Sequence, residues 1–344
     1  MIDNMDKALS KDKLGQWLDS LRRTYEVVAP VKSASGGPAE FVKTDSSSEV
    51  VLDNSEWLAP PKDYLLPKTE TLFFYDAKNE ADPLRELLAE ETPRLMLGLR
   101  ACDARAIKVL DCVYLEGEFA DPYYAARRKG MALVGFVCSD TRWSCFCTSV
   151  GDPLEWLKDV DAVLTDIGDS YVITANTPAG ESLLSDMSDM SDPSDQQMNL
   201  KVAAWDKLAS LPKRPFAEKL TKDFLAWDDP IWDTYARKCI GCGVCSYLCP
   251  SCSCFDIQDE RVGGQVERFR CRDTCQSCYF TLMGAGHNPR PEKKMRMRQR
   301  LSHKFKYQPE QFGIVGCTGC GRCVELCPVN MDIRLVLEEV ATGE

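Results

Sequence analysis

The residues of this chain that could do chemistry are its cysteines, because 18 cysteines stand against only two histidines. Eight of the cysteines fall into two segments with one spacing, C-x2-C-x2-C-x3-C followed by proline. Three closely spaced thiolates of this kind hold one [4Fe-4S] cluster, and in two-cluster ferredoxins the fourth binds the other cluster. We therefore predict one cluster on Cys239, Cys242, Cys245 and Cys327, and a second on Cys249, Cys317, Cys320 and Cys323.

Zinc is the alternative for these motifs, since C-x2-C pairs also form zinc sites. The pattern of four cysteines and a proline, occurring twice, is more specific than two isolated pairs and favours clusters. The histidines, His287 and His303, are too few for a His-rich metal site or for a chain of His-based proton transfers. The 67 residues between the motifs, 250–316, exceed what a compact ferredoxin needs and include a helical stretch, so we expect a helical ferredoxin-like domain.

A third group of thiols lies in the first half of the chain. Residues 94–99 and 130–138 are apolar and strand-like, and residues 104–114 between them are helical, which resembles a βαβ unit. A third cluster could form where the two neighbouring strands end, although the C-x-C spacing there is not a standard one. The alternative is buried thiols without ligands, which behave as small hydrophobic residues. The candidate ligands are Cys102, Cys138, Cys145 and Cys147.

Six cysteines remain. Cys112 lies on the predicted helix 104–114 and is interpreted as a core residue. The other five flank the first motif or lie in the segment between the motifs, where they could shield a cluster, bind another or form a redox-active thiol pair. These five are Cys252, Cys254, Cys271, Cys275 and Cys278.

The elements that must position these thiols indicate an α+β protein. We predict a mixed α/β domain over residues 1–227, followed by the helical ferredoxin-like dicluster domain over 228–344. Within the first domain, helices are expected at 14–21, 84–91, 199–211 and 216–227, and a strand at 25–31. Residues 182–199 repeat Met-Ser-Asp with few core-forming side chains and are expected to form an exposed loop.

Composition excludes several classes of function. The net charge of -11 disfavours a nucleic-acid partner, which requires a broad basic surface. Apolar runs are too short for a membrane span, and the N-terminus lacks an export signal, so we expect a cytoplasmic protein with reduced thiols. One segment is strongly basic and is expected either to compensate cluster charge or to dock an acidic partner. It comprises Arg290, Lys293, Lys294, Arg296, Arg298, Arg300, Lys304 and Lys306.

The sequence also resembles a known family over nearly its whole length. The runs CIGCGVCSYLCPSCSCFD, RDTCQSCYF, GAGHNPRPEKK and CTGCGRCVELCPVNMDI, together with GLRACDARAIKVLDCVYLEGEFADPYYAARR, carry the resemblance. They are similar to the iron-sulfur beta subunit of cytosolic [NiFe] hydrogenases (sulfhydrogenases) and to the A-type component of anaerobic sulfite reductase. One departure is Arg272 to Cys275, where that family usually reads Trp-Asp-Ser-Cys. Cys271 and Cys278 also look additional.

The resemblance implies a role in electron transfer. Such subunits relay single electrons between a flavoprotein that handles NAD(P)H and a hydrogenase, sulfite reductase or heterodisulfide-reductase-type subunit, without catalysing bond chemistry themselves. The eight motif cysteines match the family's two [4Fe-4S] clusters. Cys102, Cys138, Cys145 and Cys147 match family positions too, which favours the third [4Fe-4S] cluster. The rival readings are a free-standing cluster or dithiol redox enzyme, and a redox sensor with structural clusters.

Overall fold

The larger of the two sheets is built from strands in the first half of the chain. The computed structural model describes residues 5–52, 59–88, 92–185, 190–219 and 226–342. Within those ranges seven strands pair in the order β1-β9-β8-β7-β6-β2-β3, and β2, β6, β7 and β8 run parallel to one another. The strands are β1 (Asp6–Ser10), β2 (Glu26–Val31), β3 (Glu40–Lys43), β6 (Arg94–Leu99), β7 (Met131–Phe136), β8 (Ala162–Asp166) and β9 (Ser170–Ala175).

The predicted βαβ unit is confirmed. Strand β6 is followed by helix α2 (Ala101–Tyr114), and β7 then pairs with β6 in parallel. Every residue of β7 is buried, as expected for an inner strand of a parallel sheet that is covered on both faces. Because parallel strands end at the same edge of a sheet, the residues after β6 and β7 lie side by side.

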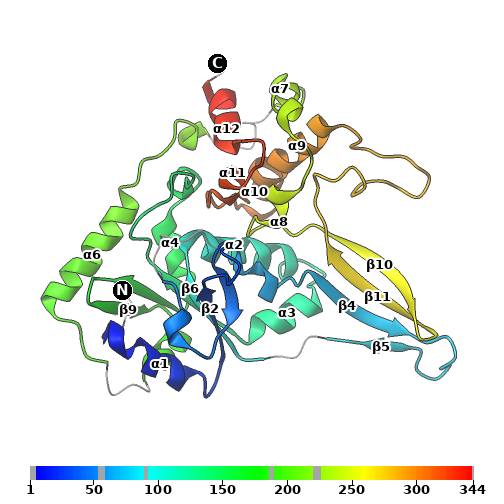
Figure 1. Ribbon diagram of the computed structural model, residues 1–344. Helices are drawn as coiled ribbons and strands as arrows, with labels where there is room; N and C mark the ends of the chain where they lie inside the picture. Colours follow the sequence, from blue (N-terminus) through cyan, green and yellow to red (C-terminus); the bar gives the residue numbers. More distant parts are fainter. Residues whose placement is uncertain (1–4, 53–58, 89–91, 186–189, 220–225, 343–344) are drawn as a thin grey trace.

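The smaller sheet joins segments that are far apart in the sequence. Strands β10 (Phe255–Val262) and β11 (Gln265–Arg272) form a hairpin, and β11 pairs with β4 (Thr69–Tyr75), which pairs with β5 (Leu84–Glu86). Gly263 and Gly264, with φ of 59° and 93°, make the hairpin turn. Figure 1 shows this sheet extending away from the helices. The segment 250–316 contains the expected helical stretch, at Lys293–Ser302, and this hairpin in addition, so the helical character of the whole dicluster domain stays a prediction.

The prediction of a helix at 84–91 is wrong. Its first three residues form β5, where they gain backbone hydrogen bonds from the edge of β4, and residues 89–91 lie outside the described ranges. The exposed loop expected at 182–199 is shorter than predicted. Helix α5 (Pro178–Ser185) covers its beginning and α6 (Asp195–Ala209) its end, while residues 186–189 are not described. Ser194 and Gln197 form a capping box that starts α6.

The remaining helices follow the predicted pattern only in part. The helix expected at 14–21 is confirmed, and most of the helix expected at 199–211 falls within α6. Of the helix expected at 216–227, residues 217–219 form a 3-10 turn instead, and residues 220–225 lie outside the described ranges. A π-helical turn at His303–Tyr307 connects α9 with α10. The helices not yet given are α1 (Leu14–Leu21), α3 (Pro122–Lys129), α4 (Pro153–Lys158), α7 (Ile231–Lys238), α8 (Val244–Tyr247), α9 (Lys293–Ser302), α10 (Gln308–Phe312), α11 (Arg322–Glu325) and α12 (Ile333–Thr342).

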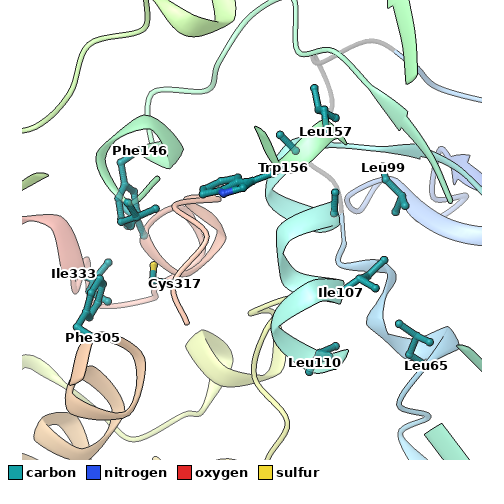
Figure 2. Packing of buried hydrophobic residues seen from close by; sticks show 14 of the residues in the cluster. Leu65, Leu99, Ile107, Leu110, Phe146, Trp156, Leu157, Phe305, Cys317 and Ile333 are labelled. Atoms are coloured by element: carbon teal, nitrogen blue, oxygen red, sulfur yellow. The ribbon is translucent and has the colours of Figure 1, made fainter. Parts of the chain in front are cut away.

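One hydrophobic core contains side chains from both halves of the chain. Ile107 and Leu110 project into it from α2, and Phe146, Phe305 and Ile333 are members of the same buried cluster (Figure 2). The chain is thus mixed α/β, as expected, and its two halves share apolar packing. The boundary between residues 227 and 228 stays a prediction.

Candidate iron-sulfur centres

The first predicted ligand set lines one cavity. Cys239, Cys242, Cys245 and Cys327 all face this space, although Cys327 is far from the others in sequence. The backbone N–H of Gly241 donates to the Cys239 sulfur over 3.4 Å, and that of Met331 donates to the Cys327 sulfur over 3.1 Å. Backbone donors to ligand sulfurs are a feature that tunes iron-sulfur clusters. The donor set and its surroundings therefore fit a [4Fe-4S] cluster.

The two motifs fold alike because the same glycines recur in both. Gly241 and Gly243 in the first motif have φ of 73° and 77°, and Gly319 and Gly321 in the second have 63° and 76°. Side chains with a Cβ rarely adopt this left-handed conformation. In each motif a short helix, α8 or α11, then begins directly after the second glycine.

The second predicted set lies deeper in the protein. Cys249 and Cys317 are buried, and the Cys249 thiol is close enough to Cys320 and Cys323 to raise the pKa of both, after the larger effect of burial. Ser251 Oγ lies 3.4 Å from the Cys249 sulfur and donates to the Gly316 carbonyl over 2.6 Å. This arrangement brings the fourth cysteine of the first motif to the first three of the second, as the spacing predicts.

The four cysteines of the first half also line a single cavity. Cys102 lies in the first turn of α2, Cys138 follows β7, and Cys145 and Cys147 come from the next loop. Burial raises the pKa of all four thiols, that of Cys138 to about 11. Such thiols stay protonated at neutral pH unless a metal centre stabilises the thiolates. The four donors in one cavity fit a third cluster.

This third cavity abuts the second motif. Cys320 and Gly319 also line it, and the Phe146 N–H donates to the Gly319 carbonyl over 2.8 Å. The ion pair of Arg142 with Glu325 fastens the same loop to α11. This contact was not predictable from the sequence, because nothing in the local pattern links residues 142–147 to residues 319–325.

We expect Gly319→Ala to disrupt the third site. A Cβ at position 319 would lie 2.5 Å from both the N and Cα of Cys147, and the φ of +63° disfavours alanine in addition. We expect the variant to lose roughly 2–4 kcal/mol of stability and part of its iron, measured by thermal melting and iron analysis. Gly313→Ala is the matched control, because its φ is +68° but its Cβ would meet no atom within 4 Å. Equal losses in both variants would contradict the close approach.

Three buried cations stand among the predicted ligands. Arg300 faces Cys245 of the first set and Cys323 of the second, and these thiols hold its pKa above the usual value despite burial. Arg322 lies near Cys320 and Cys102, and pairs with Asp103 over 2.9 Å. Lys304 Nζ donates to the Ser251 hydroxyl and to the Gly316 carbonyl, both over 3.0 Å. Arg322 lies outside the basic run for which charge compensation is predicted. Lys62, which is also buried, lies outside that run as well.

The basic run therefore has two kinds of member. The prediction that the run docks an acidic partner is wrong for Arg296 and Arg300, because both side chains are buried. Arg296 donates to the carbonyls of Gln276, Arg290 and Pro291 and so orders the turn before α9. Arg298 stacks on Trp227, with its guanidinium 3.6 Å from the ring centroid. Charge compensation by Arg300 and Lys304 stays the prediction.

The remaining cysteines differ in their surroundings. Cys112 packs against Val109 and Ile314, which confirms it as a core residue. Cys278 is exposed, and Cys271 lies half-buried on β11. The other three are in contact with thiols: Cys252 with Cys249, and Cys254 with Cys275.

In the described ranges, no three His, Cys, Asp or Glu side chains are placed so that they could hold a single metal ion. A cubane cluster instead binds each thiolate through a different iron, so its ligands surround a larger body.

Comparison with known proteins identifies an iron-sulfur domain in the C-terminal part of the chain. The family described as "4Fe-4S dicluster domain" matches residues 238–331, which contain all eight motif cysteines. "Sulfhydrogenase 2 subunit beta" of Pyrococcus furiosus is 30% identical over 343 residues, 97% of this chain and 98% of that protein. The chain belongs to the sulfhydrogenase beta-subunit family. It is accordingly an iron-sulfur electron-transfer subunit with a C-terminal dicluster domain.

Two further findings bear on this member of the family. A serine palmitoyltransferase from S. paucimobilis is 13% identical, with a TM-score of 0.21 over 63% of this chain and 57% of that one, which is too slight a likeness to inform the fold. No helix in the described parts of the chain is long and apolar enough to cross a membrane.

Proposed function

We propose that this sulfhydrogenase beta-type subunit relays single electrons through three [4Fe-4S] clusters in a cytosolic multi-subunit oxidoreductase. The first cluster is assigned to Cys239, Cys242, Cys245 and Cys327, and the second to Cys249, Cys317, Cys320 and Cys323. The third is assigned to Cys102, Cys138, Cys145 and Cys147. When bound, such clusters exchange one electron at a time between partner subunits.

The observation that carries the proposal is the order of the sites. Cys323 of the second set also lines the cavity of the first set, and Cys320 of the second set also lines the cavity of the third. The second site therefore stands between the other two, with protein thiols at both junctions. This order supports a relay with the first and third sites at its ends.

Both ends of this path have exposed residues beside them. Beside the first site, Cys242 and Ile240 are exposed, and beside the third site Trp143 is exposed in the loop that supplies Cys145. The relative's name, sulfhydrogenase subunit beta, supports a hydrogenase-type partner at one end. We assign a flavoprotein that handles NAD(P)H to the other end, since the relay needs a donor or acceptor of electron pairs.

Buried cations of the chain lie beside the proposed cluster sites and can tune their reduction potentials. Arg300 lies between the first and second ligand sets, and Arg322 between the second and third. A fixed positive charge near a cluster stabilises its reduced, more negative form and raises its reduction potential. Burial of Cys249 and Cys317 keeps water from the middle site. The protein thus binds, insulates and electrostatically tunes the clusters.

We expect Arg300→Gln to lower the potential of the neighbouring clusters. At ~10 Å and an effective dielectric constant of ~20, a unit charge is worth about 1.7 kcal/mol, or roughly 70 mV for one electron. Anaerobic redox titration followed by electron paramagnetic resonance measures the shift. Arg298→Gln is the control from the same helix, because Arg298 lies on Trp227. Equal potentials in wild type and Arg300→Gln would contradict charge compensation.

The proposal as a whole is tested by metal content and by turnover. The anaerobically purified chain should contain about twelve irons, four for each cubane cluster. Dithionite should reduce these clusters, whereas NAD(P)H alone should not, since the flavoprotein is a separate protein of the complex. About eight irons would overturn the third cluster, and oxidation of NADH by the isolated chain would overturn the relay in favour of a free-standing enzyme.

A further inference from the structure

A pair of thiols that is outside all three ligand sets lies between the first and second sites. Cys254 directly precedes β10, and Cys275 follows β11 closely, so the base of the hairpin brings the two together. The hairpin register continues to this point, because the Asp273 N–H donates to the Cys254 carbonyl over 3.0 Å. The side chains of Cys254 and Cys275 are neighbours in the structure.

Polar neighbours favour a reactive sulfur on Cys275. Gln276 Nε2 donates to the Cys275 sulfur over 3.5 Å, and Ser246 Oγ lies 3.8 Å from it. Two neighbouring thiols are the arrangement from which a disulfide forms and breaks.

The pair has neighbours in two ligand sets. Cys275 lies near Cys245 of the first set, and Cys254 lies near Cys252. Cys252 in turn is hydrogen-bonded to Cys249 of the second set. Cys254 also lines a small cavity with Arg270 and Ser253.

We propose that Cys254 and Cys275 form a reversible disulfide that stores an electron pair beside the relay. On oxidation, each thiol gives up a proton to solvent and one S–S bond forms. Two electrons leave, one to each of two one-electron acceptors of the [4Fe-4S] class at the neighbouring sites. Reduction reverses these steps. This inference rests on the proposed function, because the clusters are its electron acceptors and donors.

Such a store is useful because the electron carriers differ in the number of electrons that they transfer at once. Hydride donors and dihydrogen supply electrons in pairs, whereas a [4Fe-4S] cluster carries them singly. A dithiol accepts or releases two electrons at once and is therefore suited to a position beside single-electron carriers.

The test maps disulfides in the intact iron-loaded chain. The protein is poised under nitrogen with dithionite or with ferricyanide, quenched in acid, alkylated and digested for mass spectrometry. We expect a Cys254–Cys275 linked peptide only in the oxidised sample. Reductive titration should also consume two more electrons per chain in the wild type than in Cys254→Ser or Cys275→Ser. Cys271→Ser, a change to a thiol on the same hairpin, should match the wild type.

Several results would overturn the inference. Full alkylation of both thiols in the oxidised sample would do so, and this measurement needs no variant. A loss of iron in Cys254→Ser and Cys275→Ser would identify the pair as metal ligands instead. The wild-type iron content tests the relay separately, because too little iron there would count against the clusters while the linked peptide still reports on the pair.

Discussion

Replacing Arg322 by methionine is expected to destabilise the protein by about 3–5 kcal/mol. Arg322 and Asp103 are 4% and 0% exposed, and their ion pair joins α11 of the dicluster domain to the first turn of α2. Without the guanidinium, the Asp103 carboxylate is buried without its compensating charge. With an unfolding entropy of ~2.1 cal/mol/K per residue, this corresponds to a melting temperature lower by roughly 4–7 °C. Anaerobic calorimetry of the iron-loaded chain measures the change.

Two further variants separate this cause from general damage. Arg322→Met combined with Asp103→Asn removes both charges, and should recover at least ~1 kcal/mol relative to the single variant. Lys207→Met breaks an exposed pair with Asp140, and should lower the melting temperature by no more than about 1 °C. A double variant as unstable as the single one would show that the buried carboxylate is not the cause.

Replacing Cys138 by serine is expected to remove about four of the twelve irons. Cys138 lines the third cavity with three other thiols, and a hydroxyl is a poorer ligand for iron than a thiolate. The corresponding signal in electron paramagnetic resonance should disappear, while those of the two dicluster sites remain. Electron transfer between the partner subunits should fall by at least tenfold if the third site ends the relay.

The matched control is Cys112→Ser. Cys112 lies on α2, as Cys102 does, but packs against Val109 and Ile314 rather than facing the cavity. Its replacement should leave the iron content unchanged and lower only stability, by about 1 kcal/mol. If Cys138→Ser and Cys112→Ser kept the same iron, the third cluster would be refuted.

Local sequence was enough for the elements that are regular and strongly patterned. The β6-α2-β7 unit was predictable because apolar runs and a helical period stand next to each other in the chain. The β10-β11 hairpin was missed although its signal was present: Gly263 and Gly264 separate two segments rich in strand-forming residues. Residues 84–86 became a strand only because the edge of β4 was available to pair with them.

The cysteine spacing by itself determined the chemistry of this protein. Cysteines separated by two or three residues, with intervening glycines that reach positive φ, are typical ligands of a [4Fe-4S] cluster, so the two dicluster sets could be predicted without tertiary information. Tertiary structure decided how the sites are connected. Long-range packing placed Gly319 against Cys147 and Arg322 against Asp103, and buried Arg300 between two ligand sets. These contacts join residues that are distant along the chain, and such contacts depend on how whole elements pack, which no local spacing records.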